Sequence, residues 1–530
     1  MKILLSLFTR HKLSIFVLLL LALFVSLKSY YSFYTFQENN FPVFDGVMNE
    51  FKQLERYQKF NGDFGLLNRF NQMIYEYKGN ILSPGYSGLI TFLYPNFLIS
   101  DWDIILRSFC SVFIFSLSLF ILLKKVITPK TIIFILVIIF QLPVFYHYRY
   151  GLSTYMPELS SALFMLSGLI FMLLYIRQNN VWALCISAIL LFIAITFRLI
   201  FIVYTLLILS IFIKKIWQNF AKSTLKNRLF QLFIVSGFMI LLAVYFYPKS
   251  APFFGYYLVD VPYESTSYFS SFSSLLSYLT VQVGLVGLIS LVFILIIVNQ
   301  QGVIRSKENW FYIYPSLIYF LLIYVYNKST NVPHVTAVFT CLLIFVFLSK
   351  SNFLKKIKIS TRNELIFTIF LIILSSINYS FDVIRNSKTE QQYIIPQKLL
   401  VEISKNNSSD YLIFYDENQS IPTSVASFRK NQKLNLHTRN FLFHDLFLYQ
   451  ISKTLNIDTC ANYYINMINN NNIQLLAINQ GVNKANCFFP KVIKITEKIR
   501  ASIQANKRYY LYKTYSSKYH GIVELYKLNL

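Results

Sequence analysis

The sequence predicts a polytopic α-helical membrane protein with about eleven transmembrane helices and a small extracytoplasmic α/β domain at its C-terminal end. Of the 530 residues, 55% are hydrophobic and 18% aromatic, and only 14% are charged. These proportions are typical of helices that face lipid and not of soluble domains joined in one chain. The apolar residues gather in about eleven long runs, and the excess of basic over acidic residues is concentrated in the short segments between them.

A membrane-spanning helix needs about 20 apolar residues, and somewhat fewer where it lies among other helices. Runs of this kind lie at residues 13–34, 104–123, 131–147, 157–175, 181–197, 199–213, 229–247, 275–298, 310–326, 334–349 and 365–384. The fifth and sixth are short and are separated only at Arg198. The first is too long for a cleavable signal peptide and no small-residue cleavage pattern follows it, so it is predicted to remain as a signal anchor.

The net charge of +26 is explained by membrane topology. Basic residues accumulate in the short cytoplasmic loops of membrane proteins. With a cytoplasmic N-terminus, the inner segments hold 19 of the 49 basic residues and only 2 of the 23 acidic ones. The basic excess therefore indicates orientation and not a nucleic-acid partner. An odd number of spans predicts a transmembrane domain at residues 1–384 and an extracytoplasmic domain at residues 385–530, in a bacterial-type inner (plasma) membrane.

The C-terminal segment alternates strand-like and helix-like patterns. Strands are predicted at residues 411–415 and 473–478, helices around 441–455 and 461–469, and a hairpin in the closing segments RYYLYKTY and GIVELYKL. Together they predict a small α/β domain. Cys460 and Cys487 are the two cysteines of this segment, and an oxidising compartment would allow them to form a disulfide or leave them free.

The first outer loop, residues 35–103, carries two amphipathic stripes. Val47, Phe51, Leu54 and Tyr57 form the first, and Leu66, Phe70, Met73 and Tyr77 the second. Apolar residues three or four positions apart share one face of a helix. Both segments are predicted to be helices that lie in the membrane interface.

Four features follow one another along the chain: Asp45 after the first run, the turn at residues 83–86, Arg107 in the second run and Arg198 at the end of a middle run. In this order, and in its single span followed by a long outer loop and many further spans, the chain resembles the GT-C class of glycosyltransferases. These integral-membrane enzymes take a sugar from a polyprenyl-phosphate carrier. The turn departs from the family pattern, because a glycine follows Pro84 where the family often has a second proline.

The resemblance implies that Asp45 is the general base. A carboxylate at the outer edge of the membrane would accept the proton of an acceptor hydroxyl while polyprenyl phosphate leaves. The alternative is that Asp45 caps the helix that begins near Gly46. The two roles are compatible, because the positive end of a helix dipole stabilises an anionic base.

Glu158 is the second acidic candidate, at the start of the fourth run. In the family, acids of this outer loop can help to hold a divalent metal ion. Asp45 and Glu158 are therefore the residues that could bind Mg or Mn. The paired acidic motif that is usual in the family is missing here. The alternative is that Glu158 stands in the first turn of a helix, where the helix dipole favours glutamate. Asp101 and Asp103 spell DWD before the second run and are interpreted as helix-capping residues.

The leaving lipid phosphate needs cationic partners near the membrane surface, and arginine can donate two hydrogen bonds to its oxygens. Arg149, Arg198 and His334 are the candidates. Arg198 interrupts a long apolar stretch, and its alternative role is to extend its charge to the headgroups. The alternative for His334 is an ordinary, satisfied interfacial histidine, which is the commoner role of such a residue.

The resulting hypothesis is an enzyme that moves a sugar from a polyprenyl-phosphate donor to a glycan, lipid or protein acceptor on the outer face of the membrane, with membrane lipids as its surroundings. One alternative is an O-antigen-type polymerase or ligase, whose large outer loop lies late between spans. Another is a lipid-glycan transporter, which is expected to carry charged residues in several spans, whereas Arg198 is nearly alone in the apolar runs.

Overall fold

The computed structural model describes most of the first half of the chain and parts of the second half. The described residues are 11–39, 50, 53–54, 57, 59–60, 62–79, 92–124, 128–141, 143–147, 151–154, 157–197, 201–255, 369–370, 373, 376–377, 379–381, 383–384, 394–405, 411–414, 456–470, 473–480, 490–517 and 521–529. The chain divides into two compact units. The first consists of Met1–Tyr34, Gly65–Phe254 and Pro262–Arg385, and the second of Thr35–Phe64, Gly255–Val261 and Asn386–Leu530.

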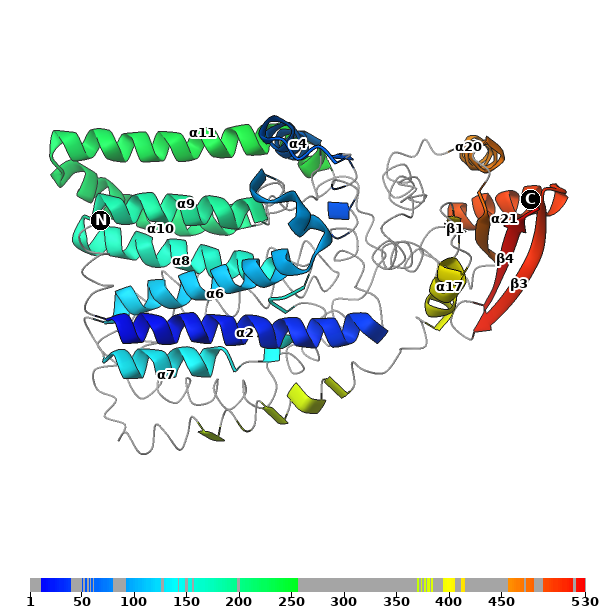
Figure 1. Ribbon diagram of the computed structural model, residues 1–530. Coiled ribbons are helices and arrows are strands. Elements are labelled where there is room, and N and C mark those ends of the chain that lie inside the picture. Colours follow the sequence, from blue (N-terminus) through cyan, green and yellow to red (C-terminus); the bar gives the residue numbers. More distant parts are fainter. Residues whose placement is uncertain are drawn as a thin grey trace, which may run out of the picture. The chain divides into compact units, whose positions relative to one another are not determined.

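The first unit is helical. In chain order its elements are α2 (Lys12–Asn39), α4 (Leu66–Gly79), η1 (Pro95–Ile99), α6 (Trp102–Leu123), α7 (Pro129–Ile139), η2 (Pro143–Tyr146), α8 (Glu158–Gln178), α9 (Val181–Phe197), α10 (Phe201–Lys222) and α11 (Leu225–Gly255). Helices α2, α6, α7, α8, α9, α10 and α11 run roughly parallel to one common direction (Figure 1). The described residues between positions 369 and 384 are helical as well.

Four helices of the described part are long and apolar enough to cross a membrane. They are Lys12–Gln37, Trp102–Leu123, Glu158–Gln178 and Leu225–Val244, and Val181–Phe197 is a shorter apolar helix. These helices agree with a membrane-embedded protein. The predicted runs at residues 275–298, 310–326 and 334–349 lie outside the described residues, so the predicted number of eleven spans stays a prediction.

One predicted span is interrupted. The apolar run at residues 131–147 forms α7, which ends at Ile139, and a separate 3-10 turn follows at Pro143–Tyr146. Pro143 explains the break, because proline lacks a backbone N–H and disfavours helical backbone in the residue before it. The chain therefore leaves the helix before the end of its apolar run and enters the segment that leads to α8.

Helix α8 is the centre of the first unit and packs between α6 and α9. Almost its whole apolar stretch is buried. Gly168 allows the closest approach to α9, since a side chain there would place its Cβ 2.8 Å from Leu191 Cγ. The hydroxyl of Ser187 donates a 2.7 Å hydrogen bond to the backbone oxygen of the same glycine. A small residue and a serine hydroxyl therefore join these two apolar helices, as is common between helices in membranes.

The second unit contains a four-stranded sheet. Its strands are β1 (Tyr411–Phe414), β2 (Leu475–Gln480), β3 (Tyr509–Ser517) and β4 (Gly521–Leu528), in the order β1-β2-β4-β3. Strands β1 and β2 are parallel, and the other two pairs are antiparallel. The predicted closing hairpin is confirmed as β3 and β4. The backbone of Gly521 has a φ of 68°, which glycine adopts readily at such a turn.

Helices cover both faces of this sheet. One core joins α20 (Ile457–Asn470) and α21 (Pro490–Ala505) to residues of β2 and β4, and the other joins α17 (Ile394–Lys405) to the opposite sides of the same strands. Leu476 and Leu475, adjacent on β2, belong to the first and second core respectively. Neighbouring strand residues point to opposite faces, so one strand supplies both cores.

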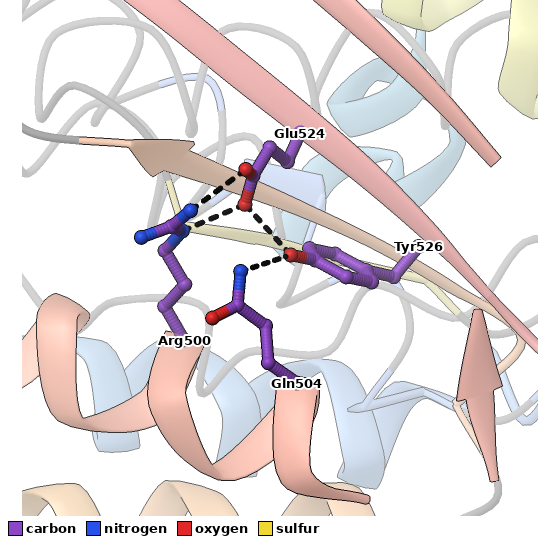
Figure 2. Close-up of polar contacts among 4 residues, drawn as sticks. All are labelled: Arg500, Gln504, Glu524 and Tyr526. Atoms are coloured by element: carbon purple, nitrogen blue, oxygen red, sulfur yellow. Dashed lines mark hydrogen bonds and ion pairs between the residues drawn. The ribbon is translucent and has the colours of Figure 1, made fainter. Parts of the chain in front are cut away.

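An ion pair fixes α21 to β4 (Figure 2). Arg500 donates hydrogen bonds of 2.7 and 2.8 Å to the two carboxylate oxygens of Glu524. Tyr526 donates to the same carboxylate at 2.7 Å and accepts a 3.0 Å hydrogen bond from Gln504. The hydrogen bonds from the Arg500 guanidinium hold the pKa of Glu524 below its ordinary value, and they outweigh the effect of burial. The carboxylate is therefore kept ionised at the helix–sheet contact.

Candidate functional site

Glu158 is the first residue of α8, directly after Pro157 at the N-cap position. This agrees with the predicted place in the first helical turn. The side chain is 0% exposed, in a helix whose other residues are mostly apolar. An ionisable side chain buried within membrane helices is costly and usually serves function. Glu158 is therefore the first candidate among the residues that the structure describes.

Arg107 brings a positive charge to the segment that precedes Glu158. It lies about one turn into α6 and is 5% exposed. Its Nη2 donates a 3.3 Å hydrogen bond to the backbone oxygen of Leu152 and a second hydrogen bond to that of Thr154. The guanidinium thus joins α6 to the segment that enters α8.

Ser108, the next residue of α6, contacts the same segment. Its hydroxyl oxygen lies 2.9 Å from the backbone oxygen of Leu152 and 3.0 Å from the hydroxyl oxygen of Ser153. The Ser153 hydroxyl is also 3.1 Å from the backbone oxygen of Ser26 on α2. Three buried serines therefore carry polar contacts across α2, α6 and this segment.

Ser29 completes the connection to α2. Its hydroxyl donates a 2.8 Å hydrogen bond to the backbone oxygen of Phe145 and accepts a 3.0 Å hydrogen bond from the backbone N–H of Ser153. Backbone groups of an irregular segment are tolerated at membrane depth only where other groups satisfy them. The serines and Arg107 provide these partners, so residues 145–147 and 151–154 are held within the helical unit by polar contacts.

Gly151 makes this segment possible. Its backbone N–H donates a 2.7 Å hydrogen bond to the backbone oxygen of His147. A Cβ at position 151 would lie 2.4 Å from that same oxygen. Any other residue would therefore force the backbone of the turn to move. The turn sets the direction in which the chain reaches Thr154 and then α8.

Asp101 and Asp103, at the start of α6, were predicted to cap this helix, and the structure differs for Asp101. Asp101 occupies the N-cap position but makes no side-chain capping hydrogen bond. Its carboxylate instead accepts a 2.8 Å hydrogen bond from the hydroxyl of Tyr30 on α2. Asp103 lies in the first turn of α6 and is buried. The capping interpretation is thus wrong for the Asp101 side chain, because a tyrosine of another helix binds it.

Lys28 is a further cation on α2, and it is half-buried. Its Nζ lies 4.2 Å from the ring centre of Tyr146 and 4.8 Å from that of Tyr379. The Tyr379 hydroxyl donates a 3.1 Å hydrogen bond to the backbone oxygen of Lys28. Aromatic faces attract cations most strongly where water is excluded. These contacts join the first and the last predicted spans.

Most residues singled out from the sequence lie outside the described part of the structure. Asp45, Arg149, Arg198 and His334 are all among them, so their roles stay predictions. Glu158 and Arg107 are described, and the latter contacts the segment that leads to the former. Among the described residues, no group of three or more His, Cys, Asp or Glu side chains is placed to hold a metal ion. No metal is therefore assigned to this site.

Several charged and hydroxyl side chains lie within this unit of apolar helices, and we name them together the polar site. It contains Asp103, Arg107 and Glu158, the serine contacts of α2 and α6, and Lys28 with its two tyrosines. No protein-family model and no curated protein matches the chain. The class that the described structure supports is a helical membrane protein with a buried polar site.

Proposed function

We propose that the protein is an integral-membrane glycosyltransferase, similar to the GT-C class, that uses a sugar carried on polyprenyl phosphate. The acceptor is a glycan, a lipid or a protein. The proposed location is a bacterial-type inner (plasma) membrane with a cytoplasmic N-terminus, eleven spans and the C-terminal domain on the outer side. The observation that carries the proposal is the complete burial of Glu158 beside the segment that Arg107 binds.

The proposed site lies where a lipid-linked donor can reach it. In the proposed topology, α2 runs outward, so Ser29 and Tyr30 lie in its outer half. Their contacts with Ser153 and Asp101 place the beginnings of α6 and α8 at the same end. Asp45 follows the end of α2 by only a few residues. The outer end of these helices therefore supplies the acids and the cation that sugar transfer needs.

The proposed reaction is a single displacement at the anomeric carbon. The oxygen of an acceptor hydroxyl attacks this carbon, and the bond from the carbon to the phosphate oxygen breaks. Asp45 takes the proton of the hydroxyl as general base, and polyprenyl phosphate leaves with the electron pair of the broken bond. Glu158 is the auxiliary acid, or a metal ligand together with Asp45. Arg198, Arg149 and His334 contact the leaving phosphate.

The test uses the purified full chain in detergent with a panel of polyprenyl-phosphate hexoses and pentoses, and it measures release of polyprenyl phosphate. Asp45→Asn is expected to lower the rate by about 10²- to 10⁴-fold, the usual contribution of a general base. Glu158→Gln is expected to lower it as well, whereas Glu497→Gln, which alters an exposed acid of α21, is not. Wild-type rates in Asp45→Asn protein of normal expression and elution profile would refute the base assignment.

A lipid-glycan transporter is the second candidate. The sequence interpretation placed Arg198 nearly alone in the apolar runs, but the half-buried Lys28 and the buried Arg107 and Glu158 also lie on α2, α6 and α8. Charged side chains on several spans are typical of a transport path. A transporter needs two compartments, so product formation in detergent supports the enzyme. Movement of the lipid-linked sugar across sealed vesicles without bond cleavage would support the transporter.

A further inference from the structure

The α17 side of the C-terminal sheet carries a concentration of lysine and tyrosine side chains. The lysines are Lys398 and Lys405 on α17, Lys513 on β3 and Lys527 on β4, and the tyrosines are Tyr510, Tyr512 and Tyr515 on β3. We name this the lysine–tyrosine face. Glu402 is the one acid that contacts it among the residues that the structure describes.

The parts of this face contact one another. Lys527 Nζ lies 3.7 Å from the ring centre of Tyr512, and Lys513 Nζ lies 5.1 Å from it. Lys513 also donates a 2.5 Å hydrogen bond to Glu402 on α17. Lys398 Nζ lies 5.7 Å from the ring centre of Tyr515. The aromatic rings and lysine charges therefore form one continuous surface across α17, β3 and β4.

An irregularity in β3 contributes to this arrangement. The pairing of β3 with β4 shifts between Leu511 and Lys513, so Tyr512 is the extra residue of a bulge. A bulge redirects side chains at the edge of a sheet. Tyr512 packs against the α17 core, where it is partly buried. The bulge thus places this ring beside the two lysines.

The charge of the face fits an anionic partner. Ion-pairing of Glu402 with Lys513 neutralises one lysine, and Lys398 and Lys405 remain exposed on α17. Burial raises the pKa of Glu402, but the hydrogen bond and charge of Lys513, aided by Lys405, lower it further, so the carboxylate stays ionised. The net charge of the named groups is therefore positive at neutral pH.

The covalent chain identifies the partner as a membrane surface. About ten residues connect the last predicted span, which ends near Ile384, to Ile394 at the start of α17. A fully extended chain of that length reaches at most about 35 Å. A lysine-rich surface tethered so close to a bilayer meets lipid headgroups first, and tyrosine is a residue that favours the membrane interface.

We propose that the lysine–tyrosine face binds the anionic phospholipid headgroups of the adjacent leaflet. The lysines supply the attraction, and the exposed ring of Tyr510 enters the interface beside them. An alternative role for lysines on an edge strand is to prevent pairing with another chain. That role predicts that hydrogen exchange at this face does not depend on the charge of the lipid. The proposal rests on the proposed membrane span that ends near Ile384, and it does not depend on the sugar-transfer activity.

The test places the full chain in nanodiscs of phosphatidylcholine alone or with phosphatidylglycerol, and it measures hydrogen exchange at the backbone amides of residues 394–405 and 509–517. Wild-type protein is expected to show slower exchange in the phosphatidylglycerol discs at about 0.1 M salt, and the difference is expected to shrink at about 1 M salt. Equal exchange in both discs at low salt would overturn the proposal.

Two charge-matched variants locate the effect. The double variant Lys398→Gln and Lys405→Gln is expected to weaken the lipid-dependent association roughly 30-fold, because each lysine near an anionic surface contributes about a five-fold factor. The control, Lys494→Gln and Lys498→Gln, changes two exposed lysines of α21, across the sheet from α17. An equal loss in both variants would overturn the assignment to this face.

Two further measurements make the outcome decisive. In phosphatidylcholine discs, the β2 amides of both double variants must exchange at the same rate as those of the wild type. Equal rates show that the sheet of each variant is intact. Dextran sulfate is then added to the same discs as a soluble polyanion. Protection that appears with dextran sulfate and not with phosphatidylglycerol would overturn the membrane assignment and indicate a soluble anionic partner.

Discussion

Arg107 on α6 donates a 3.3 Å hydrogen bond to the backbone oxygen of Leu152, which is 45 residues away in the sequence. The same nitrogen also binds the backbone oxygen of Thr154, four residues before Glu158. One guanidinium thereby satisfies two backbone groups of a segment that is otherwise irregular. This arrangement makes Arg107 a positioning residue for the start of α8.

We expect Arg107→Ala to destabilise the protein, because it leaves two buried backbone oxygens without their charged donor. Hydrogen bonds to charged groups contribute about 1.5–3 kcal/mol. Arg107→Lys is expected to retain part of this stability, since the lysine ammonium keeps the charge and N–H donors but not the planar shape and donor positions of the guanidinium. Thermal unfolding in detergent measures the effect. Arg177→Ala is the control, because it alters an exposed arginine at the end of α8.

A positioning role for Arg107 also predicts a particular effect on activity. In a transfer assay, Arg107→Lys should lower kcat more than it raises KM. The start of α8 would shift and move Glu158 from its position, whereas the affinity for the donor would stay unchanged. A variant with normal kcat and strongly raised KM would instead indicate that Arg107 binds the donor directly. The lysine variant keeps the charge, so the comparison isolates the geometry.

Gly168→Ala is expected to separate α8 from α9. The added Cβ would lie 2.8 Å from Leu191 Cγ and 3.2 Å from the backbone nitrogen of Leu191. Overpacking of this kind typically costs about 1–3 kcal/mol. Gly237→Ala on α11 is the matched control, because nothing lies within 4 Å of the position that its Cβ would occupy. A lower unfolding temperature in Gly168→Ala alone would support the close approach, and equal effects would contradict it.

The sequence predicts the elements of this protein better than their contacts. Apolar runs identify α2, α6 and α8 directly, and the alternation after Arg508 identifies the closing hairpin. Pro143 marked the end of α7, but the continuous apolar composition around it concealed the break. In α21, Ile495, Ile499 and Ile503 recur every fourth residue and all are buried, so this missed helix had a readable pattern.

The polar site was harder to predict for a physical reason. Ser153 contacts Ser26, which is 127 residues away, and an ordinary serine in an apolar segment gives no sign of its partner. Lys28 was visible as a charge in the first run, but only folding brings Tyr146 and Tyr379 to it. Contacts between distant segments depend on helix packing, which local composition does not encode.

Lys28 and Tyr379 are expected to be energetically coupled. Lys28→Met and Tyr379→Leu form a double-mutant cycle, which removes the separate effect of burying a lysine. A cation over an aromatic ring at a desolvated position contributes about 2 kcal/mol, so a coupling of about 1–2 kcal/mol is expected. Thermal unfolding in one detergent measures each variant. Tyr379→Phe keeps the aromatic ring. Lys28→Met is therefore expected to cost nearly the same free energy of unfolding in the Tyr379→Phe protein as in the wild type.

The ion pair of Arg500 with Glu524 predicts a stability that depends on pH. The hydrogen bonds from Arg500 lower the pKa of Glu524 in the folded protein below the ordinary value of 4.5. The folded state therefore favours the ionised carboxylate, and the stabilisation is complete above about pH 4.5 and disappears as pH falls through the lowered pKa. We expect Glu524→Gln to be less stable than wild type by about 1–3 kcal/mol at pH 7.

This difference should shrink steadily as pH falls below about 4.5. Hydrogen exchange of the β4 amides in the full chain, corrected for the intrinsic effect of pH, measures it at each pH. Glu497→Gln on the same helix is the control, since its carboxylate is exposed and should leave the profile unchanged. Burial raises the pKa of Glu402, but its hydrogen bond with Lys513 lowers it further, so the pKa of this carboxyl also lies below its ordinary value. The stability of Glu402→Gln must therefore be measured at the same pH values as that of Glu524→Gln. A stability difference between Glu524→Gln and wild type that stays constant from pH 7 to pH 3 would show that the ion pair does not stabilise the domain.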